Sequence, residues 1–231
     1  MNARQLIFDL PHAPQLRRED FLVTEANEAA ASAVDRWPDW PHPVLILTGP
    51  AGSGKTHLAQ SWAAVSGASI SQASTLTVEA IPGLLASGAA VIENAPGDAD
   101  DKAFFHLFNL ARETKASVLM TSATHPLHWN VTLPDLASRL KAAGLAILGA
   151  PDDALLRGVL VKLFADRQIA VDEASISYMI ARMERSLAAA RLLVAKVDRR
   201  ALEEKADVTR PFVARVLADI NEPALFPDVD E

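Results

Sequence analysis

The chain has 231 residues, 50% hydrophobic and 22% charged, which is enough apolar material for a buried core and excludes the composition of a disordered chain. Its formal net charge of −7 excludes a general attraction to nucleic acid or to an acidic membrane surface. The chain contains no cysteine, which excludes disulfides, thiolate metal sites and thiol catalysis. No apolar run reaches the roughly 18 residues of a membrane span, and the first residues lack a signal-peptide pattern. We therefore expect a soluble, cytoplasmic protein.

The first 150 residues alternate between strand-like and helix-like segments. Residues 1–20 contain two prolines and close on a run of charges, which predicts a flexible tail. Helices are expected over residues 25–37, 55–65, 77–85 and 100–115. Strands are expected over residues 44–48, 69–71, 89–92, 118–121 and 145–148. This repeated strand–helix–strand order predicts an α/β fold with a parallel sheet flanked by helices.

After residue 151 the strand signals stop. Helical periodicity continues over residues 152–166, 172–183, 186–204 and 210–220. The chain is therefore expected to have three parts, namely a tail at 1–20, an α/β domain at 21–150 and a small all-helical domain at 151–231.

A glycine-rich motif follows the strand expected at residues 44–48. Residues 49–56 read GPAGSGKT and match the phosphate-binding pattern GxxxxGK[ST] in full, between a predicted strand and a predicted helix. Such a loop directs backbone N–H groups at a phosphate, at a helix N-terminus that favours anions. Lys55 would add a positive charge, and the Thr56 hydroxyl would be a ligand for Mg²⁺. The sequence predicts binding of ADP or ATP with Mg²⁺ by Gly49, Pro50, Ala51, Gly52, Ser53, Gly54, Lys55 and Thr56.

The strand expected at residues 89–92 ends in Glu93 and Asn94. A P-loop ATPase needs an acidic residue here for Mg²⁺ and a second one to activate water. Glu93 can serve the metal, whereas the Asn94 amide cannot act as a base. We include both in the predicted nucleotide site and expect slow or absent hydrolysis by the isolated protein. The alternative, that both are ordinary polar residues at a strand end, remains open.

Several motifs around the loop resemble the AAA+ ATPase module of the bacterial replication initiator DnaA. The loop continues as GKTHL, and the α/β part is followed by a helical part. Residues 21–27 (FLVTEAN) resemble the segment that lines the adenine pocket in that family. Residues 119–122 (LMTS), followed by His125 and Pro126, resemble the strand end called sensor 1, although Ala123 replaces the usual Asp. The resemblance implies a helical lid domain, and it adds His57 and Ser122 to the expected nucleotide-binding residues.

Two arginines match positions at which this family places cations. Residues 133–140 (LPDLASRL) resemble the box with the arginine finger, which implies that Arg139 is catalytic towards nucleotide on a neighbouring subunit. Residues 182–185 (RMER) head a long helix, as the sensor-2 arginine does, which implies nucleotide contact by Arg185. Charge developing during phosphoryl transfer needs such cations. Each arginine could instead be a solvated surface charge, and a homo-oligomer that hides Arg139 is a further alternative.

The N-terminal segment QLIFDL resembles the peptide by which proteins dock on the bacterial sliding clamp, the β subunit of DNA polymerase III. A glutamine and spaced apolar side chains fit an apolar groove in extended form, with Gln5, Leu6, Phe8 and Leu10 as the expected contacts. The alternative is a disordered end, or a segment that folds back on its own domain.

The remaining features separate the chain from a full initiator. It offers no basic helix-turn-helix region at its C-terminus, so we expect no sequence-specific DNA binding of its own. Residues 72–88 are too few for the helical pair that initiators insert between their second and third strands. Together with the tail motif, this resembles the Hda family of DnaA-homologous regulators.

The resemblance to that family implies a regulator that docks on the clamp near the nucleoid or replisome, and promotes hydrolysis of DnaA-bound ATP through Arg139. This would be negative regulation of replication initiation. The alternative is a self-sufficient AAA+ ATPase of the helicase-loader type, which would hydrolyse ATP alone. A small-molecule P-loop kinase is a third hypothesis, for which the sequence offers no acceptor site.

Overall fold

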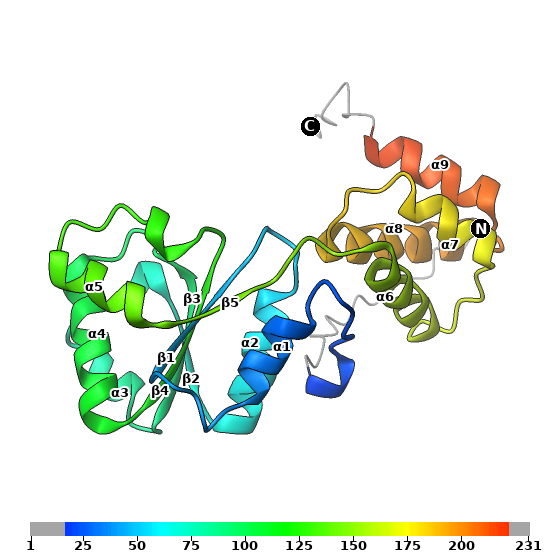
Figure 1. Cartoon of the computed structure of the whole chain (residues 1–231). Coiled ribbons are helices and arrows are strands. Elements are labelled where there is room, and N and C mark those ends of the chain that lie inside the picture. Colours follow the sequence, from blue (N-terminus) through cyan, green and yellow to red (C-terminus); the bar gives the residue numbers. More distant parts are fainter. Residues whose placement is uncertain (1–16, 222–231) are drawn as a thin grey trace, which may run out of the picture.

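The computed structural model describes residues 17–221, which form an α/β unit and a helical unit (Figure 1). The described part begins with the 3₁₀ turn η1 (Arg18–Asp20). The Arg18 guanidinium forms two hydrogen bonds to the carboxylate of Asp35, at 2.9 and 2.6 Å. Residues 18–20, which the sequence prediction assigned to the tail, therefore belong to the folded part of the chain.

Five parallel strands form one sheet in the order β2-β3-β4-β1-β5. They are β1 (Val44–Thr48), β2 (Ser69–Gln72), β3 (Ala89–Ala95), β4 (Ser117–Ser122) and β5 (Gly144–Ile147). All residues of β1 are buried, as expected of a central strand with both faces covered. The α/β class and the parallel sheet predicted from the sequence are confirmed.

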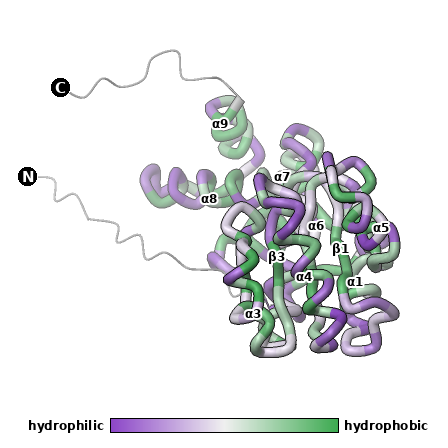
Figure 2. The backbone as a smooth tube through the Cα atoms, turned by 90° about the vertical axis from the view of Figure 1, so that its left-hand side faces the viewer, coloured by the Kyte–Doolittle hydropathy of each residue, from purple (hydrophilic) through white to green (hydrophobic). Residues whose placement is uncertain are grey.

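Helices cover both faces of the sheet. Alternate strand residues such as Leu47 and Leu119 pack with α1 (Glu28–Asp35) and α2 (Lys55–Ser66). Their neighbours Ile46 and Met120 pack on the opposite face. That face is covered by η2 (Ala73–Thr75), α3 (Ile81–Leu84), α4 (Asp101–Thr114) and α5 (Pro134–Ala142), together with Trp129, which follows η3 (Pro126–His128). Figure 2 shows the strands β1 and β3 as apolar segments within this unit.

Two segments differ from the sequence prediction. The helix expected over residues 77–85 is only the four-residue α3, in which Pro82 stands in the first turn. Proline lacks the N–H of a helix interior, so a helix that contains it has to begin just before it. In addition, residues 134–142 form the helix α5, which the strand–helix pattern did not include.

The helical unit consists of α6 (Asp153–Ala165), α7 (Glu173–Ile180), α8 (Leu187–Glu204) and α9 (Arg210–Asn221). The first three begin after capping side chains, since Asp152, Asp172 and Ser186 each accept a hydrogen bond from a backbone N–H three residues on. These helices enclose a core of their own, which includes Leu156, Phe164 and Met179.

The segment before α1 joins the two units. Phe21 belongs to the core beneath α1 and α2, whereas Leu22 packs against the core of the helical unit. Lys162 of α6 forms an ion pair of 2.8 Å with Asp20. Within residues 17–221, none of the helices is long and apolar enough to cross a membrane.

Candidate nucleotide site

The glycine-rich loop connects the end of β1 to the start of α2. Gly52 and Gly54 have positive φ angles of 70° and 101°, which other residues rarely adopt. Within residues 17–221 no side chain caps α2, because its N-cap position is Gly54, so none of these side chains uses the backbone donors of the first turn. The Ser53 hydroxyl is buried inside the loop and has no hydrogen-bond partner in the described chain. These unused donors fit a phosphate group.

The side chain of Lys55 folds back over the first residues of the loop. Its Nζ donates to the carbonyl oxygens of Gly49 and Pro50, both at 2.7 Å. Burial lowers the pKa of Lys55 from its ordinary value, and the charge of Glu93 opposes that shift. The ammonium is thus held at the loop by neutral carbonyls, where an anionic phosphate would stabilise its charged form.

Glu93 lies beside the loop, with only 3% of its surface exposed. Its Oε2 accepts hydrogen bonds from Thr121 at 2.6 Å and from Thr56 at 3.4 Å. Its Oε1 is buried without a partner among the described residues. An unsatisfied carboxylate oxygen next to a threonine hydroxyl fits a hard divalent cation. Thr56 and Glu93 would hold Mg²⁺, which would neutralise phosphate charge.

A β-bulge places Glu93 in this position. β3 has one more residue than β4 between the pairs Ile92–Met120 and Ala95–Ser122. The extra residue sits at Asn94, which has a positive φ of 61° and is exposed. Its side-chain amide donates to Gln72 Oε1 at 2.9 Å. Asn94 therefore serves the local structure of the bulge, and it offers no base for activating water.

The segment of residues 21–27 lies against the loop. A Cβ on Gly54 would be 3.3 Å from the Phe21 ring, and this ring meets the His57 ring edge-on with 5.3 Å between centroids. His57 Nε2 lies 3.0 Å from the Arg17 carbonyl oxygen. Burial lowers the pKa of His57, which favours the neutral ring. The sequence resemblance associates residues 21–27 and the segment GKTHL with nucleotide. In the structure, Phe21 of the first segment lies against His57 of the second.

The helical unit also touches the loop. The N–H of Leu187, the first residue of α8, donates to the Gly52 carbonyl oxygen at 2.9 Å. Arg185 lies just before this contact, but its guanidinium donates to Pro151 O at 3.3 Å and pairs with Asp153 at 2.7 Å. The predicted sensor-2 residue therefore precedes the residue that contacts the loop, but its guanidinium is bound at the start of α6.

The sensor-1 strand end contains a residue that the sequence prediction left out. The Ser122 side chain, which we expected at the nucleotide, donates to the Thr124 carbonyl oxygen at 2.8 Å. Its neighbour Thr121 binds Glu93 instead, and also accepts a hydrogen bond from the Asn94 N–H at 3.0 Å. The neighbouring positions of β3 and β4 in the sheet could have suggested Thr121, but the strand pattern alone does not say which of two adjacent hydroxyls faces the site.

Arg139 belongs to α5, which covers the sheet face opposite α2 (Figure 1). It lines a hollow with His42 and Pro43, which precede β1, whereas the phosphate-binding loop follows β1. The Arg139 guanidinium stacks on the Phe105 ring, 4.9 Å from the ring centroid. The predicted finger is therefore remote from the nucleotide site of its own chain. The predicted clamp-binding residues Gln5, Leu6, Phe8 and Leu10 lie outside the described residues.

Comparison with solved structures finds this fold in replication proteins and a DNA motor. Domain III of Thermotoga maritima DnaA is 18% identical, with a TM-score of 0.73 over 91% of this chain and 98% of that one. AMPPCP-bound DnaA from Aquifex aeolicus is 18% identical, with a TM-score of 0.66 over 82% of this chain and 66% of that one. A RuvB structure from Thermotoga maritima, also 18% identical, reaches a TM-score of 0.68 over 89% and 72% of the two chains.

Sequence comparison adds nothing to these structural matches. No protein-family model matches the chain, and no curated protein matches it. At this level of identity the structural likeness concerns the fold. The chain therefore has the fold of a P-loop AAA+ module with a helical C-terminal lid, similar to domain III of DnaA and to RuvB.

Proposed function

We propose that this protein is an adenine-nucleotide-binding regulator of the Hda type, which docks on the sliding clamp and promotes hydrolysis of ATP bound to DnaA. In this role Arg139 is the arginine finger offered to the partner's nucleotide, and the outcome is negative regulation of replication initiation. The protein would act in the cytoplasm, at the nucleoid or replisome.

The position of Arg139 is the observation that carries this proposal. It lies on the face of the sheet opposite α2, and it lines a hollow with His42 and Pro43 before the start of β1, whereas the phosphate-binding loop follows the end of β1. Its guanidinium is therefore placed away from the loop of its own chain. Within residues 17–221 it forms no ion pair, and its only ring contact is Phe105. A free cation on an outer helix is suited to a phosphate carried by a second subunit.

The nucleotide of this chain would have a mainly structural role. The Asn94 amide is bonded to Gln72 and supplies no base, while the loop contacts α8 of the lid through Gly52. Bound ADP or ATP with Mg²⁺ would then stabilise the joint between the two units by mass action. Calorimetry with ADP tests this role, since Lys55→Ala should abolish saturable binding while leaving the fold intact.

The finger is tested by measuring ATP hydrolysis by DnaA with purified protein and DNA-loaded clamps. Arg139→Ala should lower the stimulated rate by about 10³-fold or more, as for other arginine fingers. Lys141→Ala, which removes a positive charge from the same helix, is the matched control and should retain stimulation. Full stimulation by Arg139→Ala would refute the finger assignment.

Clamp docking is tested separately by pull-down with the isolated clamp. Replacing Gln5 and Leu6 with Ala should remove binding, because the motif depends on one glutamine and spaced apolar side chains. Unchanged binding would show that the tail is not the docking segment.

A self-sufficient AAA+ ATPase is the second candidate, and the buried Glu93 beside Thr56 favours it because the Mg²⁺ ligands are kept. Steady-state phosphate release by the protein alone separates the two candidates. A regulator should release little phosphate without DnaA, whereas a motor of the helicase-loader type should turn over unaided.

A further inference from the structure

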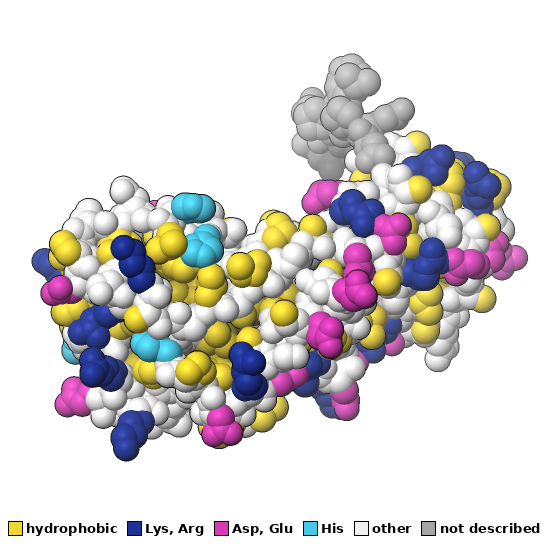
Figure 3. Space-filling model, in the orientation of Figure 1, with side chains coloured by type: hydrophobic (Ala, Val, Ile, Leu, Met, Phe, Trp, Pro, Cys, Tyr) yellow, Lys and Arg dark blue, Asp and Glu magenta, His cyan; other side chains and the backbone are white. Residues whose placement is uncertain are grey.

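A hollow of about 600 Å³ lies between α4 and α5, away from the phosphate-binding loop. Its floor includes Phe108, and its walls carry Arg112 from α4 and Arg139 from α5. Asp135 and His42 also line it. In Figure 3, basic side chains gather at the α4–α5 end of the α/β unit, beside histidine and apolar surface.

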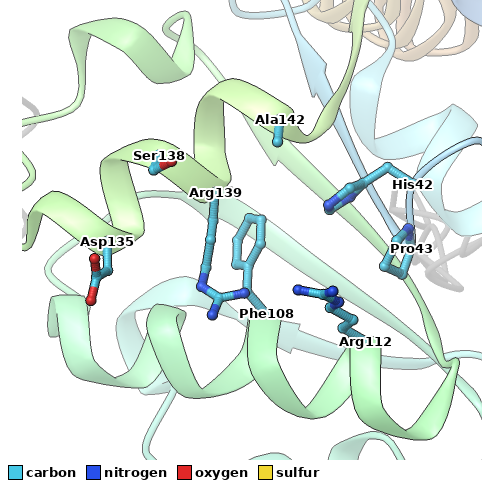
Figure 4. Close-up of a pocket in the computed structure, with 8 residues that line it drawn as sticks. All are labelled: His42, Pro43, Phe108, Arg112, Asp135, Ser138, Arg139 and Ala142. Carbon is cyan, nitrogen blue, oxygen red and sulfur yellow. The ribbon is translucent and has the colours of Figure 1, made fainter.

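The two arginines of this hollow share one space, and no carboxylate of the described residues pairs with both. Figure 4 shows their guanidinium groups turned towards each other across Phe108. Within residues 17–221, the ion pairs involve neither arginine, and Asp135 pairs with neither. Two like charges in one hollow repel each other, so an anion placed between them would be stabilised by both.

The chemistry of the hollow selects a particular kind of anion. A guanidinium offers a planar fork of donors that matches the oxygens of a phosphate, and stacking on Phe105 fixes the orientation of Arg139. A pair of such forks is suited to a chain of phosphates, whose charge is spread over several oxygens.

The surface beside the hollow points to a protein as the carrier of this anion. Ala142 of the hollow is followed within a few residues by β5, whose Leu145 and Ile147 are 40% and 59% exposed. Leu145 pairs with Ile46, whose side chain lies on the α4 and α5 face of the sheet, so Leu145 lies on that face too. Exposed apolar groups next to cations are typical of protein interfaces.

We propose that Arg112 and Arg139 together bind the polyphosphate of a nucleotide held by a second AAA+ subunit. This inference rests on the proposed function and adds Arg112 as a second phosphate-binding residue. Arg112 gave no signal in the sequence, because a single arginine on an amphipathic helix is an ordinary surface residue.

A direct titration tests the site without the partner. The protein is first saturated with ADP, so that its own loop is filled, and tripolyphosphate is then added while the arginine side-chain Nε–H signals are followed by NMR. The signals absent from Arg112→Gln and Arg139→Gln should both shift in the wild type. Arg112→Gln should weaken binding about 10-fold or more, because a hydrogen bond to a charged group is lost.

The matched control is Lys102→Gln, which makes the same charge change on α4 away from the hollow. It should bind tripolyphosphate as the wild type does. The proposal is overturned if neither arginine signal moves, or if Arg112→Gln and Lys102→Gln bind equally well.

The second experiment measures the stimulated hydrolysis of ATP by DnaA. Arg112→Gln should lower the stimulated rate about 10-fold to 100-fold, and Arg112→Lys should be intermediate, because lysine keeps the charge and loses the fork. If Arg112→Gln stimulates hydrolysis as strongly as the wild type does, this inference is wrong and the proposed function is unaffected. If the wild type gives no stimulation, the proposed function is wrong, and so is the assignment of the polyphosphate to a nucleotide on DnaA. The titration then decides whether the two arginines bind polyphosphate.

Discussion

Thr121 is the residue that links β3 and β4 at the nucleotide site. Its hydroxyl donates to Glu93 Oε2 at 2.6 Å and accepts from the Asn94 N–H at 3.0 Å. Thr121→Val has nearly the same shape but satisfies neither group. Because a buried carboxylate and a backbone donor lose their partner, we expect the free energy of unfolding to fall by about 1–3 kcal/mol. Urea denaturation of the nucleotide-free protein measures this change.

Thr114→Val is the matched control for this substitution. The Thr114 hydroxyl is exposed and donates to the Leu110 carbonyl oxygen of its own helix. Its loss should change the free energy of unfolding by less than about 0.5 kcal/mol. Equal effects of the two substitutions would mean that Thr121 does not hold Glu93 in place.

At the scale of elements, α5 carries Arg139 and is anchored to α4 through one carboxylate. Asp101 Oδ2 accepts hydrogen bonds from the N–H and hydroxyl of Thr132, both at 2.6 Å, and from the N–H of Leu133 at 3.2 Å. Asp101→Ala removes this anchor, and we expect it to lower the free energy of unfolding by about 1–3 kcal/mol. Amide hydrogen exchange in α5 should become faster than in α2. Asp98→Ala, an exposed carboxylate nearby, should do neither.

The stabilisation by Asp101 should also depend on pH. Burial alone would raise the pKa of Asp101, but the bonds from Thr132 and Leu133 outweigh it and hold the pKa below its ordinary value of 3.8. A carboxylate with a lowered pKa stabilises the fold above its unfolded pKa, and this contribution is lost as the pH falls through the folded pKa. The difference between wild type and Asp101→Ala should therefore be full at pH 7 and shrink below about pH 4. A constant difference down to the acid transition would contradict this role.

Elements with a clear apolar pattern could be predicted from the sequence, whereas features fixed by single contacts could not. β1 was expected and found over the same residues, because a short apolar run between proline and glycine leaves few alternatives. The bulge at Asn94 depends on the register of β3 against β4, which a linear pattern does not contain. The partners of Arg185 and the hollow around Arg112 depend in the same way on how separate helices meet.

At the scale of the whole molecule, the two units meet around the phosphate-binding loop. A Cβ on Gly52 would lie 2.6 Å from the Ser186 Cβ, directly before α8. Gly52→Ala should therefore push the lid away from the loop, in addition to the strain of its positive φ. Gly67→Ala is the matched control, because Gly67 has a φ of 69° but, in the described part of the chain, no atom within 4 Å of the added Cβ.

Unfolding followed by two probes separates these effects. All 4 tryptophans of the chain lie in the α/β unit, so their fluorescence reports that unit alone, whereas far-UV circular dichroism reports the helices of both units. Without nucleotide, wild type and Gly67→Ala should give coincident transitions, with Gly67→Ala less stable by about 1 kcal/mol. In Gly52→Ala the circular dichroism should fall before the fluorescence, because the lid unfolds without the support of the loop. Coincident transitions in Gly52→Ala would mean that the contact of Leu187 with Gly52 does not couple the units, and that the segment of Phe21 and Leu22 joins them by itself.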